Sequence, residues 1–391
     1  TSRGGPRGAR AVTSAPLPLL AALARLHQWG AAARGAFAAK RAESSPIPVV
    51  SIGNLCFGGA GKTPAAAWMI DQLAARGRRP AVLSRGYAGT RAAAPLLVAR
   101  RGEILVPASA SGDEPQLIAR ATKAHVVVVA RRRIEAARLA AREGADVAVL
   151  DDGFQHRALR RALDVVLLDA AWSPRARAAS PADLLREGPR ALRRAGAILL
   201  ADAPEELGAG HDGPLRADEV PAPIAALFAG AAAPPLFFAA RRRPTTLTLE
   251  RAAADDGPAT NAPGAKPALV PGEAVPATVL EGKLILAVSG VARPERFAAS
   301  LRALGAIVAA HVVVPDHHAY DAADAATIRR RAEETSAALV VTTAKDAVRW
   351  PAGAPAPAVL REEFLVRGGD ALVDLALRRC AAEAAAAGPP K

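Results

Sequence analysis

The sequence predicts an α/β protein in which a parallel sheet, covered by helices on both faces, is followed by a second, smaller α/β domain. From about residue 46, short apolar segments alternate with amphipathic ones. A glycine-rich segment joins the first apolar segment to the first amphipathic one, and the alternation pauses after residue 201 and resumes near residue 281. Apolar strands that alternate with helices are typical of a parallel sheet buried on both faces.

The first unit contains six apolar segments of strand length, which we expect to be buried strands: residues 47–52, 80–84, 126–130, 147–150, 165–169 and 197–201. Residues 64–76 and 134–143 are amphipathic and are predicted helices; the first stops at Gly77, a residue type that commonly ends helices.

Residues 202–280 differ in composition. The stretches 202–235 and 251–280 are rich in Pro, Gly, Ala and Asp, and two short strands are predicted between them, at 236–240 and 245–249. We interpret this region as a linker with a flexible insertion. The alternation then resumes, with strands predicted at 284–289, 307–314 and 338–342 and helices at 294–304 and 322–335.

The net charge of the 391-residue chain is +14, which favours an acidic partner: nucleic acid, anionic lipid or a phosphorylated substrate. The two cysteines, Cys56 and Cys380, form neither a metal-binding spacing nor a disulfide framework, so a reducing compartment is expected.

The N-terminal segment is basic. Residues 1–42 contain seven Arg or Lys residues and no Asp or Glu, interspersed with Leu, Trp and Phe. We expect a basic amphipathic segment that lies on an anionic membrane; the alternatives are a helix packed on the domain and a frayed terminus. A cleaved export signal is less favoured, because polar residues and then a buried strand follow the apolar stretch, and no apolar run is long enough to cross a bilayer.

The strongest motif lies between the first strand and the first helix, as a phosphate-binding P-loop requires. Its residues are Gly58, Gly59, Ala60, Gly61, Lys62, Thr63 and Pro64. Small residues let backbone N–H groups approach phosphates, Lys62 would neutralise the β- and γ-phosphates, and Thr63 would offer its hydroxyl to Mg²⁺. Cys56 stands where such loops usually have their first glycine. The plainer alternative is a glycine-rich turn with an incidental Lys-Thr.

A second motif follows the predicted strand 147–150: Asp151, Asp152, Gly153, Phe154, Gln155 and His156. An acidic residue at the carboxyl end of a buried strand beside a P-loop is where a Mg²⁺-binding carboxylate is found. The residues do not decide between Asp151 and Asp152, and such an acid can also simply cap the next turn.

Asp113 and Glu114 follow Gly112 and precede a predicted helix, where they could serve as a base and a metal ligand or could merely cap the helix. In the second unit, Asp316, His317 and His318 form an acid–imidazole cluster that could close on the nucleotide site or lie in a surface loop. Two weaker signals are Arg85 with Tyr87, and Arg186 with Glu187.

Taken together and in this order, these motifs resemble the tetraacyldisaccharide 4′-kinase family of lipid A biosynthesis. The resemblance rests on the elements 51–54, 58–64, 84–87, 112–115, 151–156, 185–187, 290–297, 315–317 and 343–346, and it extends over about residues 16–350. Gly-Gly-x-Gly-Lys-Thr-Pro followed by Asp-Asp-Gly-Phe-Gln-His is highly specific. Departures are Ala88 and Ala344, which replace a common Gly and Glu, and the longer insertion 251–280.

The resemblance implies a kinase that uses ATP and Mg²⁺ to phosphorylate the 4′-hydroxyl of a tetraacylated glucosamine disaccharide 1-phosphate. It implies a peripheral location on the cytoplasmic face of the inner membrane. Asp113 is the implied catalytic base and His317 its hydrogen-bonded partner, while Thr63, Glu114 and Asp151 or Asp152 would serve the metal. The implied substrate-site residues are Arg85, Tyr87, Gln155, His156, Arg186 and Glu187.

The resulting order of parts is a basic membrane-associating segment (1–45), a P-loop kinase core (46–235), a linker and flexible insertion (236–280), and a smaller α/β domain (281–391) that closes over the site. Because His317 belongs to the last part, the pair with Asp113 would assemble only on closure. The expected partners are the lipid A disaccharide precursor and an anionic membrane surface, without nucleic acid or an obligate protein partner.

Two other functions fit the sequence less well. A P-loop GTPase or metallochaperone would need an Asn/Thr-Lys-x-Asp motif, and in Thr343-Ala344-Lys345-Asp346 the Lys and Asp are adjacent, so the motif fails. A nucleotide-gated protein that binds membranes or nucleic acid would suit the charge but leaves both acidic motifs unexplained.

Overall fold

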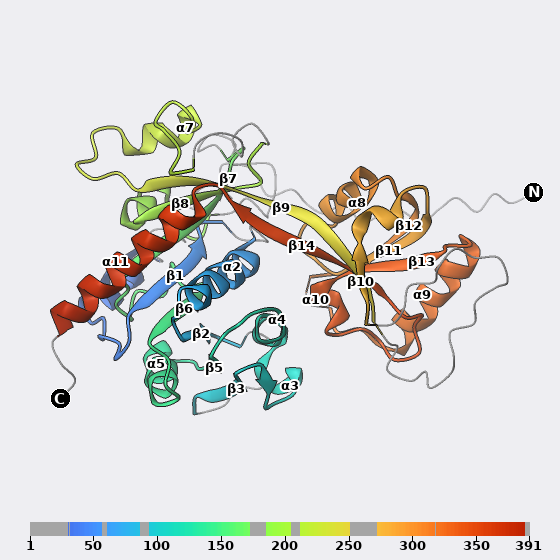
Figure 1. Cartoon of the computed structure of the whole chain (residues 1–391), viewed down its shortest axis with the longest axis horizontal. Helices are drawn as coiled ribbons and strands as arrows, with labels where there is room; N and C mark the ends of the chain where they lie inside the picture. Colours follow the sequence, from blue (N-terminus) through green and yellow to red (C-terminus); the bar gives the residue numbers. More distant parts are fainter. Residues whose placement is uncertain are drawn as a thin grey trace, which may run out of the picture.

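The computed structural model describes residues 30, 32–56, 61–86, 94–172, 185–204, 212–250, 272–316 and 318–387. These residues form two α/β lobes joined by a pair of long strands (Figure 1). The fourteen described strands belong to one continuous sheet, which confirms the predicted α/β class.

The larger lobe is built on a mostly parallel sheet. Its strands are β1 (Val49–Asn54), β2 (Pro80–Ser84), β3 (Leu96–Arg100), β4 (Glu103–Ile104), β5 (Val126–Val129), β6 (Val147–Asp151), β7 (Leu163–Asp169) and β8 (Ala197–Ala201). The order β8-β7-β1-β6-β2-β5 is parallel throughout, and β3 and β4 add an antiparallel edge that the sequence pattern did not predict. The six expected strands are all present.

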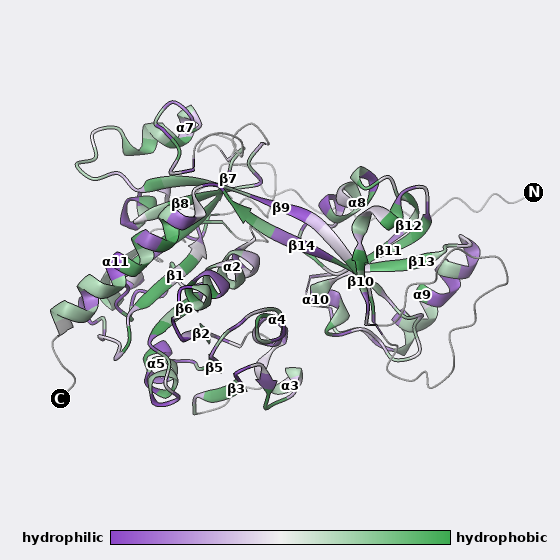
Figure 2. Ribbon diagram, in the orientation of Figure 1, coloured by the Kyte–Doolittle hydropathy of each residue, from purple (hydrophilic) through white to green (hydrophobic). Residues whose placement is uncertain are grey.

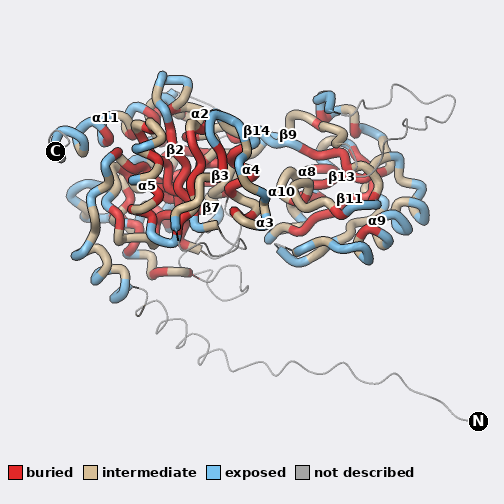
Figure 3. The backbone as a smooth tube through the Cα atoms, turned by 90° about the horizontal axis from the view of Figure 1, so that it is seen from below, coloured by how far each residue is buried: buried red, intermediate tan, exposed pale blue. Residues whose placement is uncertain are grey.

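Helices cover both faces of this sheet. They are α2 (Lys62–Ala75), α3 (Ala108–Ser111), α4 (Asp113–Ala121), α5 (Arg133–Arg142), η2 (Pro189–Arg194), α7 (Ala222–Ala225) and η3 (Ala226–Phe228). Alternate residues of one strand face opposite sides: Val50 packs in a cluster with α2 and α4, whereas Val49 packs with α5. The strands are therefore buried on both faces, which explains their continuous apolar sequence (Figure 3).

A single strand, β9 (Leu236–Leu249), replaces the two short strands expected at 236–240 and 245–249, and that expectation was wrong. Its first four residues pair with β8, and most of its remaining length pairs antiparallel with β14 (Ala358–Val366). Pro244 lies in the middle, where the register with β14 shifts. A proline at such an irregularity interrupts the sequence pattern without ending the strand. Both strands run from one lobe to the other (Figure 1).

The smaller lobe contains β10 (Ala274–Pro276), η4 (Ala277–Leu280), β11 (Leu284–Ser289), α8 (Pro294–Ala303), β12 (Ile307–Val313), α9 (Ala322–Glu334), β13 (Leu339–Thr343) and α10 (Ala344–Ala347). Strands β12, β11, β13 and β14 are parallel. Phe297 of α8 and Ile328 of α9 belong to different apolar clusters, so these helices cover opposite faces.

The last helix, α11 (Gly369–Ala387), packs on the larger lobe rather than on the lobe that precedes it. Leu372, Val373, Ala376 and Cys380 are buried in the same cluster as α2. The alternating green and purple colours of this helix in Figure 2 reflect that apolar stripe beside solvated residues. The boundaries predicted from the sequence assign this helix to the smaller domain, 281–391. In the structure it packs on the larger lobe instead.

The predicted membrane segment falls mostly outside the described residues, which include a helix over 32–40. On it Phe37 is 58% exposed, and the Arg41 guanidinium lies 4.2 Å from the centre of its ring. Within the described ranges, none of the helices combines the length and apolar character that crossing a bilayer requires. Residues 251–271 of the expected insertion also lie outside the description.

Candidate active site

The lysine of the glycine-rich segment lies against the ends of β1 and β6. Lys62 begins α2, directly after Gly61, whose φ of 82° suits glycine. Its Nζ donates a hydrogen bond to Oδ1 of buried Asn54 (3.2 Å) and lies 3.6 Å from Oδ1 of Asp152. Thr63 and Pro64 follow in the first turn of the helix. The remaining predicted residues, Gly58, Gly59 and Ala60, lie outside the described residues.

The acidic motif after β6 folds back onto β1. Gln155 donates from Nε2 to the backbone oxygen of Asn54 (2.9 Å). A Cβ on Gly53 would lie 2.7 Å from the backbone nitrogen of Phe154, so a side chain at residue 53 would prevent this approach. Gly53 thus lets the turn at 152–155 sit beside the end of β1.

Asp152 is the acidic partner of two cations. Nη1 of Arg186 lies 2.8 Å from both of its carboxylate oxygens and 3.4 Å from Oε1 of Gln155, and Nζ of Lys62 lies 3.6 Å from Oδ1. Burial alone would raise the pKa of Asp152, but the charges of Lys62 and Arg186 outweigh it and hold the pKa below its ordinary value. Asp152 is therefore ionised at neutral pH.

Asp151 has the opposite environment. Its side chain is buried at the end of β6, and burial, followed by repulsion from Glu114 and Asp152, raises its pKa to about 7, although Lys62 and Arg133 oppose the shift. Among the described residues, its Oδ1 has no hydrogen-bond partner. A buried carboxylate oxygen without a partner is costly unless another group binds it.

The donor set fits a magnesium ion. Among the described residues, no three His, Cys, Asp or Glu side chains are gathered closely enough to form a metal site alone. Mg²⁺ is commonly held by one or two carboxylates, with water and phosphate oxygens completing its shell. The unsatisfied Oδ1 of Asp151, with Glu114 near enough to raise its pKa, supplies oxygen donors of that kind.

Arg133 is a site residue that sequence reasoning missed. It begins α5 at the carboxyl end of β5, is 5% exposed, and donates from Nη1 to the carbonyl of Ala130 (2.8 Å). Its Nε has no acceptor within the described ranges. Burial, then repulsion from Arg85, lowers its pKa to about 10, so it stays charged at neutral pH. It is the third of three consecutive arginines, and no sequence signal separates it from its exposed neighbours Arg131 and Arg132.

His156 lies within the field of these arginines. Burial, followed by repulsion from Arg133, Arg161 and Arg85, lowers its pKa to about 4. The ring is therefore neutral at pH 7. Arg85 itself is exposed at the end of β2, and Tyr87 lies outside the described residues.

Glu187 is buried in a two-bonded ion pair with Arg194 (2.9 and 3.0 Å). The Arg194 guanidinium lies 4.4 Å from the centre of the Phe154 ring. In the structure Glu187 thus supports the turn that carries the acidic motif, a role that neither its residue type nor its spacing indicates.

The smaller lobe reaches the site at α4. Asp113 and Glu114 begin this helix after Gly112, and Nε of Arg349, which follows α10, lies 3.3 Å from Oδ2 of Asp113. His317, the expected partner of Asp113, lies outside the described residues. Its neighbour Asp316 pairs with Lys345 (2.7 Å).

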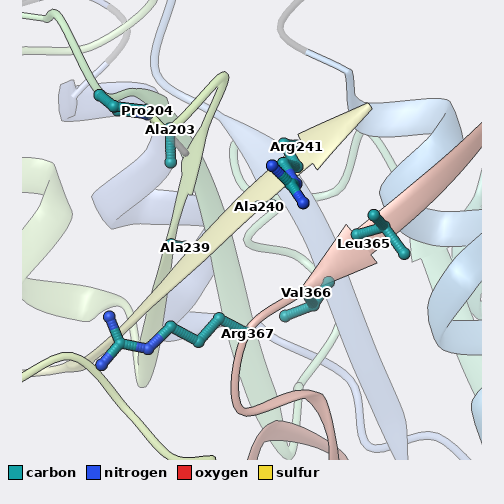
Figure 4. Close-up of a pocket in the computed structure, with 8 residues that line it drawn as sticks. All are labelled: Ala203, Pro204, Ala239, Ala240, Arg241, Leu365, Val366 and Arg367. Carbon is teal, nitrogen blue, oxygen red and sulfur yellow. The ribbon is translucent and has the colours of Figure 1, made fainter. Parts of the chain in front are cut away.

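A cavity of about 180 Å³ lies apart from this site, where the beginning of β9 and the end of β14 meet the segment that follows β8 (Figure 4). It is lined by Ala203, Pro204, Ala239, Ala240, Arg241, Leu365, Val366 and Arg367. Nη2 of Arg367 is held by Glu219 (2.9 Å), and none of the lining residues belongs to the motifs above.

Known proteins share both the sequence and the fold. The family model for tetraacyldisaccharide-1-P 4′-kinase matches residues 16–368. The chain is 43% identical over 387 residues to the tetraacyldisaccharide 4′-kinase of Anaeromyxobacter dehalogenans (strain 2CP-C), covering 95% of this chain and 91% of that protein. It is 35% identical over 306 residues to that of Syntrophus aciditrophicus (strain SB), covering 78% and 75%.

A similar solved structure is the crystal structure of the "apo" form of LpxK from Aquifex aeolicus in complex with ATP. The TM-score is 0.66 and the sequence identity 25%, with 93% of this chain and 99% of that chain covered. The match thus includes both lobes. With the family model and the relatives in agreement, the chain belongs to the tetraacyldisaccharide 4′-kinase family.

Proposed function

We propose that this chain transfers the γ-phosphate of ATP to the 4′-hydroxyl of a tetraacylated glucosamine disaccharide 1-phosphate, a late step of lipid A biosynthesis. Family membership supports the activity. At the level of residues, the activity rests on the approach of Lys62 to Asp152, beside a buried oxygen of Asp151 that has no partner in the described part of the chain.

Lys62 neutralises the transferring phosphate. Asp152 and Asn54 contact the ammonium group of Lys62 and orient it. Arg133 and Arg85 add positive charge near the acidic pair. Phosphoryl transfer depends mainly on positioning and charge neutralisation, so such an arrangement of cations suits the reaction.

Asp151, Glu114 and the hydroxyl of Thr63 are the proposed holders of Mg²⁺. Of the two adjacent acids, Asp151 is the better candidate, because Asp152 is already paired with Arg186 and Lys62. Bound Mg²⁺ would supply neutralisation of charge on the phosphate oxygens.

Asp113 is the proposed general base and His317 its partner. A sugar hydroxyl is a weak nucleophile, so a carboxylate within hydrogen-bond reach must accept its proton as transfer proceeds. The position of Asp113 at the junction of the lobes, in contact with Arg349, supports a base that is completed when the lobes close.

We further propose that the protein is peripheral to the cytoplasmic face of the inner membrane and that residues 1–45 attach it. The seven unopposed positive charges of residues 1–42 support this, at roughly 1 kcal/mol for each charge near an anionic surface. Sedimentation with anionic and neutral vesicles, with and without residues 1–42, tests the attachment.

Transfer of labelled γ-phosphate to the disaccharide 1-phosphate in anionic vesicles tests the function. Lys62→Ala should lower kcat by on the order of 10²–10³-fold, as expected when a group that stabilises the transition state is lost. Asp113→Ala should lower it by about 10²–10⁴-fold with ATP binding retained. The exposed Lys123→Ala is the matched control. Activity of Lys62→Ala within a few-fold of wild type would remove this lysine from the mechanism.

A further inference from the structure

Arg349 is held by several groups of the smaller lobe. Its side chain is 10% exposed; Nη2 lies 3.2 Å from Oδ1 of Asp346, and Nη1 donates to the carbonyl oxygen of His318 (2.7 Å). The Tyr320 ring centre is 5.9 Å from its Cζ. A planar guanidinium with several fixed donors suits contacts in three directions, which the single ammonium of lysine cannot reproduce.

Asp346 is held as firmly as the arginine that it orients. The residue is fully buried, and its carboxylate accepts hydrogen bonds from the hydroxyls of Thr343 (2.6 Å) and Tyr320 (3.2 Å). A Cβ on Gly290 would lie 2.9 Å from its Oδ1, so glycine there leaves room for the carboxylate. Two elements of the family resemblance, at 290–297 and 343–346, thus meet at this carboxylate.

The third side of the guanidinium points across to the larger lobe. Nε of Arg349 lies 3.3 Å from Oδ2 of Asp113, whose side chain is 14% exposed. The contact is an ion pair rather than a hydrogen bond, because no acceptor of the described residues lies in hydrogen-bonding geometry to Nε–H. In Figure 1, α10, which precedes Arg349, faces α4, which begins with Asp113.

We propose that Arg349 is a positioning residue for the phosphoryl transfer. One guanidinium contacts Asp113 of the larger lobe and the carbonyl of His318, the residue that follows His317. It thereby fixes the position of the Asp113 carboxylate relative to the smaller lobe when the lobes meet. A misplacement of about 1 Å in such a group can cost on the order of 10²-fold in rate. The inference rests on the proposed role of Asp113 as base.

The test must separate positioning from stability, because removing Arg349 alone leaves the buried Asp346 carboxylate without its cation. The double variant Arg349→Gln/Asp346→Asn removes both charges. It should keep the thermal melting transition and lower kcat by about 10–100-fold, with the KM for ATP within about twofold of wild type. Arg349→Lys keeps the positive charge, so its kcat should be at least about threefold higher than that of Arg349→Gln. No recovery in a folded Lys variant would count against the ion pair.

A double-mutant cycle gives the decisive readout. If Arg349 acts through Asp113, the Arg349→Gln/Asp346→Asn pair should cost less than about twofold further in an Asp113→Ala background. Arg293→Gln, which removes another ion pair between the lobes, is the matched control and should cost the same factor in both backgrounds. An equal loss for the Arg349 pair in both backgrounds would overturn the inference. Wild-type activity of Asp113→Ala would instead refute the proposed base.

Discussion

Two adjacent aspartates show how the surroundings of a residue, rather than its type, decide its chemistry. Asp151 and Asp152 follow each other at the end of β6, yet the pKa of the first is raised to about 7 and that of the second is lowered. Burial dominates at Asp151, whereas Lys62 and Arg186 prevail at Asp152. The pair therefore divides into a carboxylate suited to a metal ion and one that orients cations.

His156 gives a prediction at this scale. Its pKa is about 4 in the folded protein and about 6.5 in an unfolded chain, so below pH 6.5 the unfolded state takes up the proton first. The contribution to stability is complete above pH 6.5 and is lost as the pH falls toward 4. Between pH 7.5 and 5.5, wild type should lose about 1 kcal/mol more of its free energy of unfolding than His156→Asn.

Urea unfolding at the two pH values measures this difference. His125→Asn is a suitable control, because the His125 ring contacts the carbonyl oxygen of Glu143 (2.9 Å) rather than a group of arginines. Equal losses of stability in wild type and His156→Asn would contradict the lowered pKa of His156.

At the scale of the elements, the site depends on how closely β1 approaches the turn after β6. Both strands end at the same edge of the parallel sheet, as the topology requires. Gly53 and Gly153 remove the side chains that would separate them: a Cβ on Gly153 would lie 2.6 Å from Cγ of Leu150 and 2.7 Å from Oγ of Ser51. The acidic motif is thus fixed by backbone packing as well as by its own ion pairs.

Gly53→Ala should therefore destabilise the fold and impair the site together. The added methyl group would meet the backbone nitrogen of Phe154 at 2.7 Å, and backbone cannot move aside as a flexible side chain can. We expect a loss of about 1–3 kcal/mol in the free energy of unfolding and a lower kcat.

Gly77→Ala makes the comparison specific. Gly77 has a φ of +75° but no atom within 4 Å of a built Cβ, so alanine there costs only backbone strain of about 1 kcal/mol and should leave kcat unchanged. Comparable losses of kcat in the two variants would show that general destabilisation, rather than the contact with Phe154, controls activity.

The sequence predicted the regular elements better than the contacts between them. Buried parallel strands need apolar residues on both faces, so they are visible as apolar runs. The short edge strands β3 and β4 and the continuous β9 through Pro244 carry no such signal, because an edge strand is only half buried and proline is read as an interruption.

The same limit applies to the site. Lys62, Asp151 and Asp152 belong to local motifs, so their spacing predicts them. Arg133 and Arg349 are ordinary arginines in sequence and become site residues only through the fold, the first by burial beside the acids and the second by reaching across from the other lobe. Contacts between distant segments have no local pattern.

For the whole molecule, one sheet joins the two lobes, and ion pairs hold them on both sides of the crossing strands. Asp169 and Asp202, at the carboxyl ends of β7 and β8, contact Arg293 and Arg296 of the smaller lobe, with the Arg293 pair at 3.0 Å. Arg349 makes the corresponding contact with Asp113. If the smaller lobe closes over the site as proposed, these contacts would loosen on opening while the pairing of β9 with β14 stays intact.

The ion pairs between the lobes should determine how firmly the lobes are held together. Asp169→Asn/Asp202→Asn removes the two pairs with Arg293 and Arg296, and also the longer contact of Asp202 with Arg242 of β9 (3.9 Å). These partly exposed pairs together contribute on the order of 1 kcal/mol, so kcat/KM should fall by about fivefold at low salt. Because salt screens such pairs, wild type should lose activity as NaCl rises toward about 0.5 M, and the variant, which lacks them, should lose less. Glu334→Gln, which breaks pairs with Arg330 and Arg331 inside the smaller lobe, should keep the wild-type salt dependence.

Small-angle scattering should show a larger radius of gyration for the double variant. Parallel salt curves for the two proteins, with equal radii, would mean that the strands alone set the distance between the lobes.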